Sequence, residues 1–97
     1  MRETTLAALF REIESVDDEM IVFVPQGDEV NLTTPALVLD FDESEEGVPG
    51  YRYLLEVELV KDVIEVWSEW RDGQVPSPDE KLSAVLHYAR NDAYQPV

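Results

Sequence analysis

The sequence predicts a small α+β domain in which an antiparallel sheet of about three strands carries three helices on one face. Short β-branched apolar runs lie in the first half of the chain, and apolar residues with helical spacing lie near both ends. The expected order is helix, strand, strand, strand, helix, helix. A length of 97 residues fits one domain, so we expect residues 1–97 to fold as a single unit.

The first two expected helices are indicated by apolar residues that recur on one helical face. In residues 5–15 these residues are Leu6, Leu9, Phe10 and Ile13, and Thr4 or Thr5 can cap the helix. From about Glu58 to the "DGQVP" segment they are Val60, Val63, Ile64 and Trp67. Lys61, Asp62, Glu65 and Glu69 are expected to face water on this second helix.

The last expected helix has the clearest start signal in the chain. In "SPDE", Ser77 serves as the cap, Pro78 takes the first helical position, and Glu80 completes a capping box. The helix is expected to fray near Asn91. Its apolar residues are Leu82, Val85, Leu86 and Ala89.

Three apolar runs are expected to form the sheet. The first is "MIVFV" at 20–24, which is short and β-branched and which Pro25 ends. The second is "PALVLDFD" at 35–42, and the third is the mostly alternating run at 51–57. The polar "QGDEVNLTT" segment and the turn-rich "EEGVPG" at 45–50 connect them.

Charge is the dominant feature of the composition. The chain has 22 acidic against 7 basic residues, for a formal net charge of -15, and no basic residue lies between Arg11 and Arg52. Contacts to phosphate need Lys and Arg, so we expect no direct binding to nucleic acid and none to an anionic membrane surface. The partner favoured by this charge is a basic protein.

The chain contains no cysteine, which excludes disulfides, thiolate zinc sites and a cysteine nucleophile. No apolar run approaches the roughly 20 residues of a membrane span. The N-terminal "MRETTLAALFREIE" lacks the apolar core of a signal peptide. We therefore expect a cytoplasmic protein.

The "LVLDFD" segment resembles the opening motif of the haloacid-dehalogenase-like phosphotransferases. The resemblance implies that Asp40 is the nucleophile and Asp42 the acid and base. That family continues with a small residue and Thr, whereas this chain has Glu43 and Ser44. Its chemistry also needs a cation for the phosphoryl group and a doubly wound sheet, which 97 residues cannot build. We expect no enzymatic activity.

The same segment partly matches a calcium loop. Asp40, Asp42 and Ser44 take the first, third and fifth positions of an EF-hand-like pattern. The sixth position should be Gly but is Glu45, and the twelfth should be Glu but is Tyr51. The sharp turn and the bidentate ligand are therefore missing, and we expect no metal site and no cofactor.

Few other side chains suggest a site. His87 is the only histidine, and Ser83 and Asn91 within helical reach do not make an organised triad, so a structural role is favoured. Trp67 lies on the apolar stripe and is expected in the core. Trp70 is the better candidate for an exposed interface anchor.

Three interpretations of the acidic excess remain: recognition of a basic partner, adaptation to high salt, and a simple solvated surface. Clustering of the acids in one half of the chain favours recognition. The expected partner-binding residues comprise the acidic burst after the second strand, a second patch before the first strand, and one aromatic anchor. They are Asp40, Asp42, Glu43, Glu45 and Glu46, then Asp17, Asp18 and Glu19, and Trp70.

The segments "TTPALVLDFDESEEGVP", "YLLEVELVKDVIEVW" and "KLSAVLHYARNDAYQPV" resemble a family of small acidic bacterial proteins of unclassified function, similar to the immunity proteins of toxin–immunity systems. The resemblance runs from about Asn31 to Tyr94. It implies a protein without activity of its own that binds and blocks a toxin, often a basic nuclease. Two alternatives stay open: a nucleic-acid mimic that inhibits a defence or DNA-processing complex, and a salt-adapted housekeeping domain.

Overall fold

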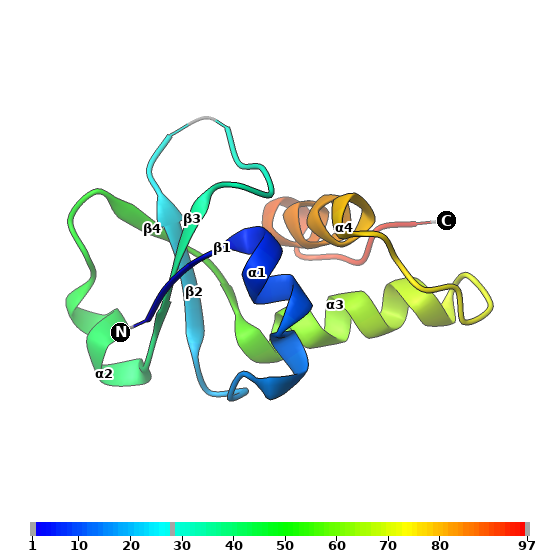
Figure 1. Cartoon of the computed structure of the whole chain (residues 1–97), viewed down its shortest axis with the longest axis horizontal. Coiled ribbons are helices and arrows are strands. Elements are labelled where there is room, and N and C mark those ends of the chain that lie inside the picture. The colour runs from blue at the N-terminus through cyan, green and yellow to red at the C-terminus, as the bar shows by residue number, and fades with distance from the viewer. Residues whose placement is uncertain (1, 28, 97) are drawn as a thin grey trace.

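A four-stranded antiparallel sheet lies at the centre of the computed structural model, which describes residues 2–27 and 29–96 (Figure 1). The spatial order of the strands is β1-β3-β2-β4. Their bounds are β1 Arg2–Thr5, β2 Ile21–Pro25, β3 Pro35–Leu39 and β4 Tyr51–Glu56. The predicted α+β class is confirmed, with one strand more than expected.

The helices cover the two faces of the sheet unequally. Their bounds are α1 Leu6–Arg11, the 3-10 turn η1 Ile13–Ser15, α2 Phe41–Glu46, α3 Val57–Glu69 and α4 Pro78–Asn91. Helices α1, α3 and α4 lie on one side, and the short α2 lies on the other (Figure 1). The main core therefore forms between the sheet and the three helices on the first side.

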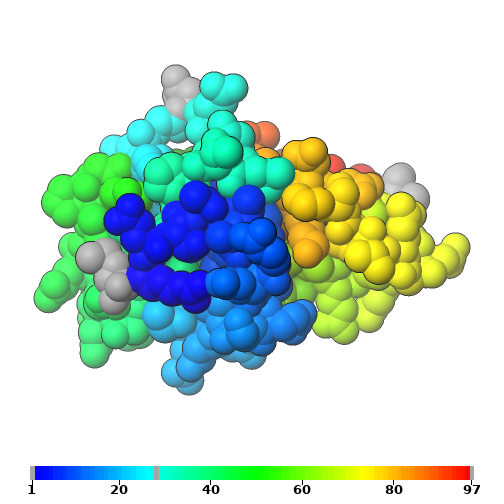
Figure 2. Space-filling model, viewed as in Figure 1, coloured from blue at the N-terminus to red at the C-terminus, as the bar shows by residue number. Residues whose placement is uncertain are grey.

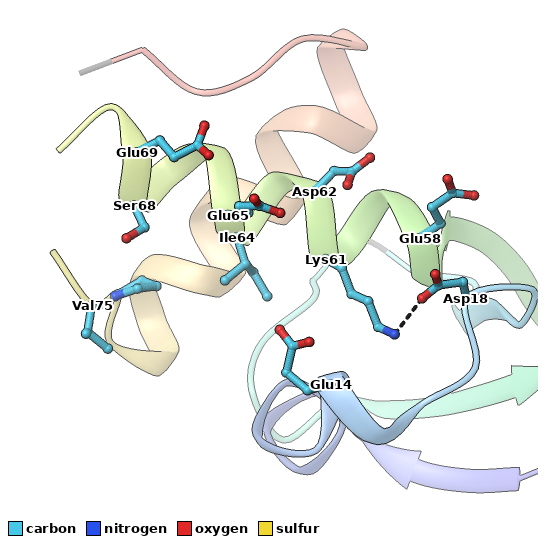
Figure 3. Close-up of a pocket in the computed structure, with 11 residues that line it drawn as sticks. Glu14, Asp18, Glu58, Lys61, Asp62, Ile64, Glu65, Ser68, Glu69 and Val75 are labelled. Atoms are coloured by element: carbon cyan, nitrogen blue, oxygen red, sulfur yellow. Dashed lines mark hydrogen bonds and ion pairs between the residues drawn. The ribbon is translucent and has the colours of Figure 1, made fainter. Parts of the chain in front are cut away.

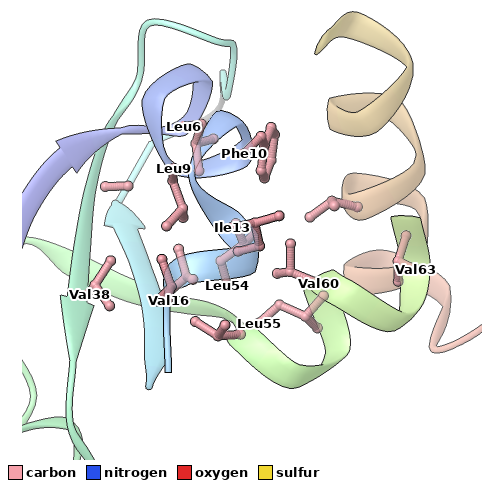
Figure 4. Packing of buried hydrophobic residues seen from close by; sticks show 14 of the residues in the cluster. Leu6, Leu9, Phe10, Ile13, Val16, Val38, Leu54, Leu55, Val60 and Val63 are labelled. Carbon is pink, nitrogen blue, oxygen red and sulfur yellow. The ribbon is translucent and has the colours of Figure 1, made fainter. Parts of the chain in front are cut away.

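Apolar side chains from both halves of the chain meet in this core (Figure 4). Leu6, Leu9 and Phe10 from α1 lie opposite Val60 and Val63 from α3. The predicted core residue Trp67 is only 6% exposed, which confirms its assignment. On α4 the buried residues are Ala84 and Val85, whereas Ala89, expected on the apolar stripe, is exposed.

The opposite face of the sheet has a smaller apolar cluster. Phe23, Leu37 and Leu39 are buried there, with Ile21, Val48 and Tyr51 packed against them. In β4 the register shifts so that Phe23 pairs with Tyr53 and Val22 with Leu55. Leu54 is therefore an extra residue, and both Leu54 and Leu55 become buried.

The start of the chain differs from the prediction. Residues 2–5 form β1, which pairs antiparallel with β3 as an edge strand. No apolar alternation marks this strand in the sequence, because all four of its residues are polar. The expected helix at 5–15 begins at Leu6, after Thr5, whose hydroxyl accepts a hydrogen bond from the Ala8 amide at 3.2 Å. It ends at Arg11 and continues only as the η1 turn.

The predicted strand at 35–42 is wrong beyond Leu39. Asp40 accepts a hydrogen bond from the Glu43 amide at 2.8 Å, and the Glu43 carboxylate accepts one from the Asp40 amide at 3.1 Å. This capping box starts α2. Residues 45 and 46, expected in a connector, belong to this helix. Local side-chain hydrogen bonds therefore end the strand where the acidic burst begins.

Candidate functional site

A groove with a volume of about 550 Å³ lies beside α3 (Figure 3). We call it the α3 groove. One wall is α3, and the other comes from the chain around η1 and from the segment before α4. Its lining residues are Glu14, Asp18, Glu58, Lys61, Asp62, Ile64, Glu65, Ser68, Glu69, Val75 and Pro76.

Helical spacing places the acids of α3 in one row. Glu58, Asp62, Glu65 and Glu69 follow one another at intervals of four, three and four residues, so they share one face of the helix. Another face carries Val57, Val60, Val63 and Trp67, all of which are buried. The packing of this apolar face against the core thus fixes the row of carboxylates at the surface.

Lys61 is the only basic residue among those that line the groove, against six acidic ones. Its ammonium group donates hydrogen bonds to the Val16 carbonyl at 2.7 Å and to the Asp18 carboxylate at 2.5 Å (Figure 3). These contacts join α3 to the chain that precedes β2. The positive charge is thereby held against Asp18, and the rest of the groove keeps a strong negative potential.

A second cavity of about 410 Å³ adjoins the first. It is lined by Asp18, Glu19, Ile21, Phe41, Glu56 and Glu58, and it shares Asp18 and Glu58 with the α3 groove. We call it the Phe41 pocket. Its apolar part consists of Ile21 and the Phe41 side chain, which is 64% exposed. The two cavities together form one acidic surface that runs from α3 to the start of α2.

The residues predicted before β2 lie close to this surface. Asp18 lines both cavities, and Glu19 lines the Phe41 pocket. Asp17 lines neither, and its carboxylate instead accepts a hydrogen bond from the Glu19 amide at 2.9 Å. The patch therefore contributes two carboxylates to the surface, one of which is already paired with Lys61.

The acidic burst contributes differently from what its sequence suggested. Asp40 caps α2, and the predicted carboxylates that follow it line neither cavity: Asp42, Glu43, Glu45 and Glu46. Phe41, the apolar residue within the burst, reaches the pocket instead. Sequence reasoning missed Phe41 and the acidic row of α3. The row was detectable because its acids repeat at helical spacing in a segment already predicted to be a helix.

Trp70 is 49% exposed, in line with its predicted exposure, but it lines neither cavity. Its ring meets Tyr94 edge-on at 5.9 Å, and Tyr94 lies 5.2 Å from the ring of Tyr88. Partial desolvation raises the pKa of Tyr88, and the nearby Asp92 carboxylate raises it further. These aromatic residues pack the C-terminal segment onto the end of α3 and α4.

The residues considered for a calcium loop or a catalytic triad make local hydrogen bonds. Across 2–27 and 29–96, no three or more Asp, Glu or His side chains are grouped so that they could hold a metal ion. Ser44 donates to the Phe41 carbonyl at 2.7 Å within α2, so the calcium-like segment is helical. The Ser83 hydroxyl accepts from Gln95 at 3.0 Å, and Asn91 donates to the His87 carbonyl at 3.0 Å.

Comparison with known families gives the relationship of the whole chain. A family described as a domain of unknown function, DUF7716, matches residues 3–97. The chain belongs to the DUF7716 family. No curated protein and no solved structure matches it. The match agrees with the expectation of a family of unclassified function and extends beyond the expected 31–94. DUF7716 membership assigns no activity and does not itself connect the chain to immunity proteins.

Figure 2 shows the face on which α1 and η1, in blue, lie beside α4 in orange and α3 in yellow-green. Over the described ranges of this DUF7716 chain, no helix is both long and apolar enough to span a bilayer.

Proposed function

We propose that this DUF7716 chain is a non-enzymatic binding protein that neutralises a basic protein partner. The observation that carries the proposal is the lining of the α3 groove, which has six acidic residues and one lysine that is already paired. The partner class that best fits is a nuclease toxin, since a surface that binds phosphate must be basic. The chain would then act as the immunity protein that covers this surface.

The mechanism is occlusion guided by charge. Carboxylates held in a row on a packed helix attract a basic surface and raise the rate of association. Apolar residues in the groove then slow dissociation because they lose water on contact: Ile64, which is half-buried, and Val75, which is 83% exposed. A chain without cysteine also suits a reducing compartment, so the cytoplasm is the proposed place of action.

A nucleic-acid mimic directed at a defence or DNA-processing complex is the second candidate. The regular spacing of the carboxylates on α3 favours it, because steps of three or four residues correspond to about 4.5–6 Å along a helix. Such a row imitates a run of backbone phosphates. Both candidates place a basic protein in the α3 groove, and they differ in the identity of that protein.

The test is an affinity capture from the lysate of the native cell with two variants of equal charge change. The groove variant carries Asp62→Asn, Glu65→Gln and Glu69→Gln, and the control carries the α2 changes Asp42→Asn, Glu45→Gln and Glu46→Gln. We expect the wild type and the control to retain one basic nuclease or DNA-processing complex at low salt. The groove variant should lose it, because the removed carboxylates line the cavity.

Other outcomes reassign the function. Loss in the α2 control alone would place the binding site on the acidic burst. Retention of no specific protein by the wild type at low or moderate salt would favour the salt-adapted domain. That alternative also predicts that the unfolding temperature keeps rising in molar salt, beyond the screening range of ~0.1 to 1 M.

A further inference from the structure

Phe41 is a large apolar side chain that stays mostly exposed in the folded chain. It is the first residue of α2, and its position is set by the capping box of Asp40 and Glu43. The cluster on this side of the sheet is made by Phe23, Leu37 and Leu39 without Phe41. With 64% of its surface exposed, its ring is available to a partner.

The surroundings of Phe41 specify the chemistry of the occupant. Every other residue that lines the pocket, apart from Ile21, carries a carboxylate: Asp18, Glu19, Glu56 and Glu58. An apolar side chain placed here would take water away from these carboxylates without compensation, which is unfavourable. A cation with a flat apolar face can stack on the Phe41 ring and pair with the surrounding carboxylates.

Arginine fits this description better than lysine. Its guanidinium group stacks on aromatic rings and donates paired hydrogen bonds to carboxylates, whereas an ammonium group is a compact, strongly hydrated charge. The pocket volume of about 410 Å³ lies within the range of about 300–1,000 Å³ typical of ligand sites, so a whole arginine side chain can enter.

The pocket is also continuous with the proposed binding groove. Asp18 and Glu58 line both cavities, so a partner segment that lies along α3 would bring its next residues to Phe41. We propose that the Phe41 pocket binds one arginine side chain of the basic partner, stacked on the Phe41 ring and bonded to the surrounding carboxylates. This inference rests on the proposed function and adds that an arginine side chain anchors the partner in the Phe41 pocket.

The test uses two peptides of equal charge, hexa-arginine and hexa-lysine, titrated into the full chain by calorimetry. We expect the wild type to prefer hexa-arginine. Phe41→Ala should lower the affinity for hexa-arginine by about two- to five-fold, the usual size of an exposed cation–π contact. The affinity for hexa-lysine should change by less than that. Tyr53→Ala is the control, since Tyr53 is a 48% exposed aromatic residue outside both cavities.

A second measurement detects the contact with the Phe41 ring directly and does not depend on a change in affinity. In proton spectra of hexa-arginine bound to the wild type, the δ-methylene protons of arginine should move upfield through the ring current of Phe41. They should not move when Phe41→Ala binds the peptide. No upfield shift with the wild type, or equal weakening of both peptides by Phe41→Ala, overturns the arginine pocket.

The two proposals fail in different ways. The groove variant, which carries Asp62→Asn, Glu65→Gln and Glu69→Gln, should lower the affinity for both peptides. Unchanged binding of both peptides would count against the α3 groove as the binding surface. If this variant weakens both peptides while Phe41→Ala changes neither, the groove stands and only the arginine pocket is rejected.

Discussion

Helices α2 and α3 are both rich in carboxylates, but only α3 arranges them along a cavity. In α2 the acids are nearly consecutive in a helix of six residues, none of which is buried. In α3 they are spread over a helix of 13 residues, whose other face holds Val57, Val60, Val63 and Trp67 in the core. The denser acidic segment in sequence is therefore not the one whose carboxylates line the α3 groove.

Helix geometry explains the difference. Consecutive residues of an α-helix are about 100° apart around the axis, so adjacent acids point in different directions. Acids three or four residues apart share a face, as they do from Glu58 to Glu69. The apolar side of α3 also fixes the direction of its acidic row, whereas α2 has no buried residue to fix its own.

The largest expected change in the free energy of unfolding contrasts a core residue of α3 with an exposed residue of α2. Trp67→Ala should lower the free energy of unfolding by about 3–5 kcal/mol, because it leaves a cavity in the core and removes the ring under Arg71, which lies 4.3 Å away. Phe41→Ala should change it by less than about 0.5 kcal/mol. Urea denaturation measures both. Similar losses in the two variants would mean that Phe41 belongs to the core.

The next effect tests what holds α2 together. Asp40→Ala should cost about 1 kcal/mol, because it removes the acceptor for the Glu43 amide, and Ser77→Ala in the second capping box should cost about as much. Asp40→Asn keeps a capping side chain and should retain most of the stability. A loss as large with Asn as with Ala would show that the charge of Asp40 matters more than its cap.

A smaller change in stability distinguishes a carboxylate with like-charged neighbours from one that is paired with a lysine. Asp62 has Glu58 and Glu65 as neighbours on its helix face, so Asp62→Asn should stabilise the fold by about 0.2–0.5 kcal/mol per like-charge pair at low salt. Asp18→Asn should instead destabilise it by up to about 1 kcal/mol, because Asp18 bonds Lys61. Thermal unfolding at low and high salt measures both, and salt should shrink each effect. The same sign for both would contradict this assignment.

The smallest effect concerns Tyr53, at the edge of the sheet. Desolvation raises the pKa of Tyr53, and the Glu56 carboxylate, which also lines the Phe41 pocket, raises it further. The unfolded hydroxyl titrates near a pKa of about 10, so its contribution to stability is complete below that pH and is lost as pH rises through the higher folded pKa. Phenolate absorbance during an alkaline titration should show a late step, to which Tyr88 also contributes, that becomes smaller in Tyr53→Phe and moves to lower pH in Glu56→Gln.

Local signals in the sequence determined much of this protein. Ser77 and Glu80 marked the start of α4, Thr4 or Thr5 marked that of α1, and the spacing of Val60, Val63 and Trp67 identified the buried face of α3. These features depend on hydrogen bonds and periodicity within a few residues, so sequence contains them directly. The acidic row of α3 belongs to the same kind, although it was not recognised as a site.

Only the tertiary structure decided which residues share a surface. The polar strand β1 exists because β3 offers it an edge, and Leu54 is buried because the register of β4 shifts against β2. Asp18, Phe41 and Glu58 are distant in sequence, yet they line one pocket. Their meeting depends on how strands pair and helices pack across the whole chain, and such long-range geometry leaves no mark on the neighbouring residues of a sequence.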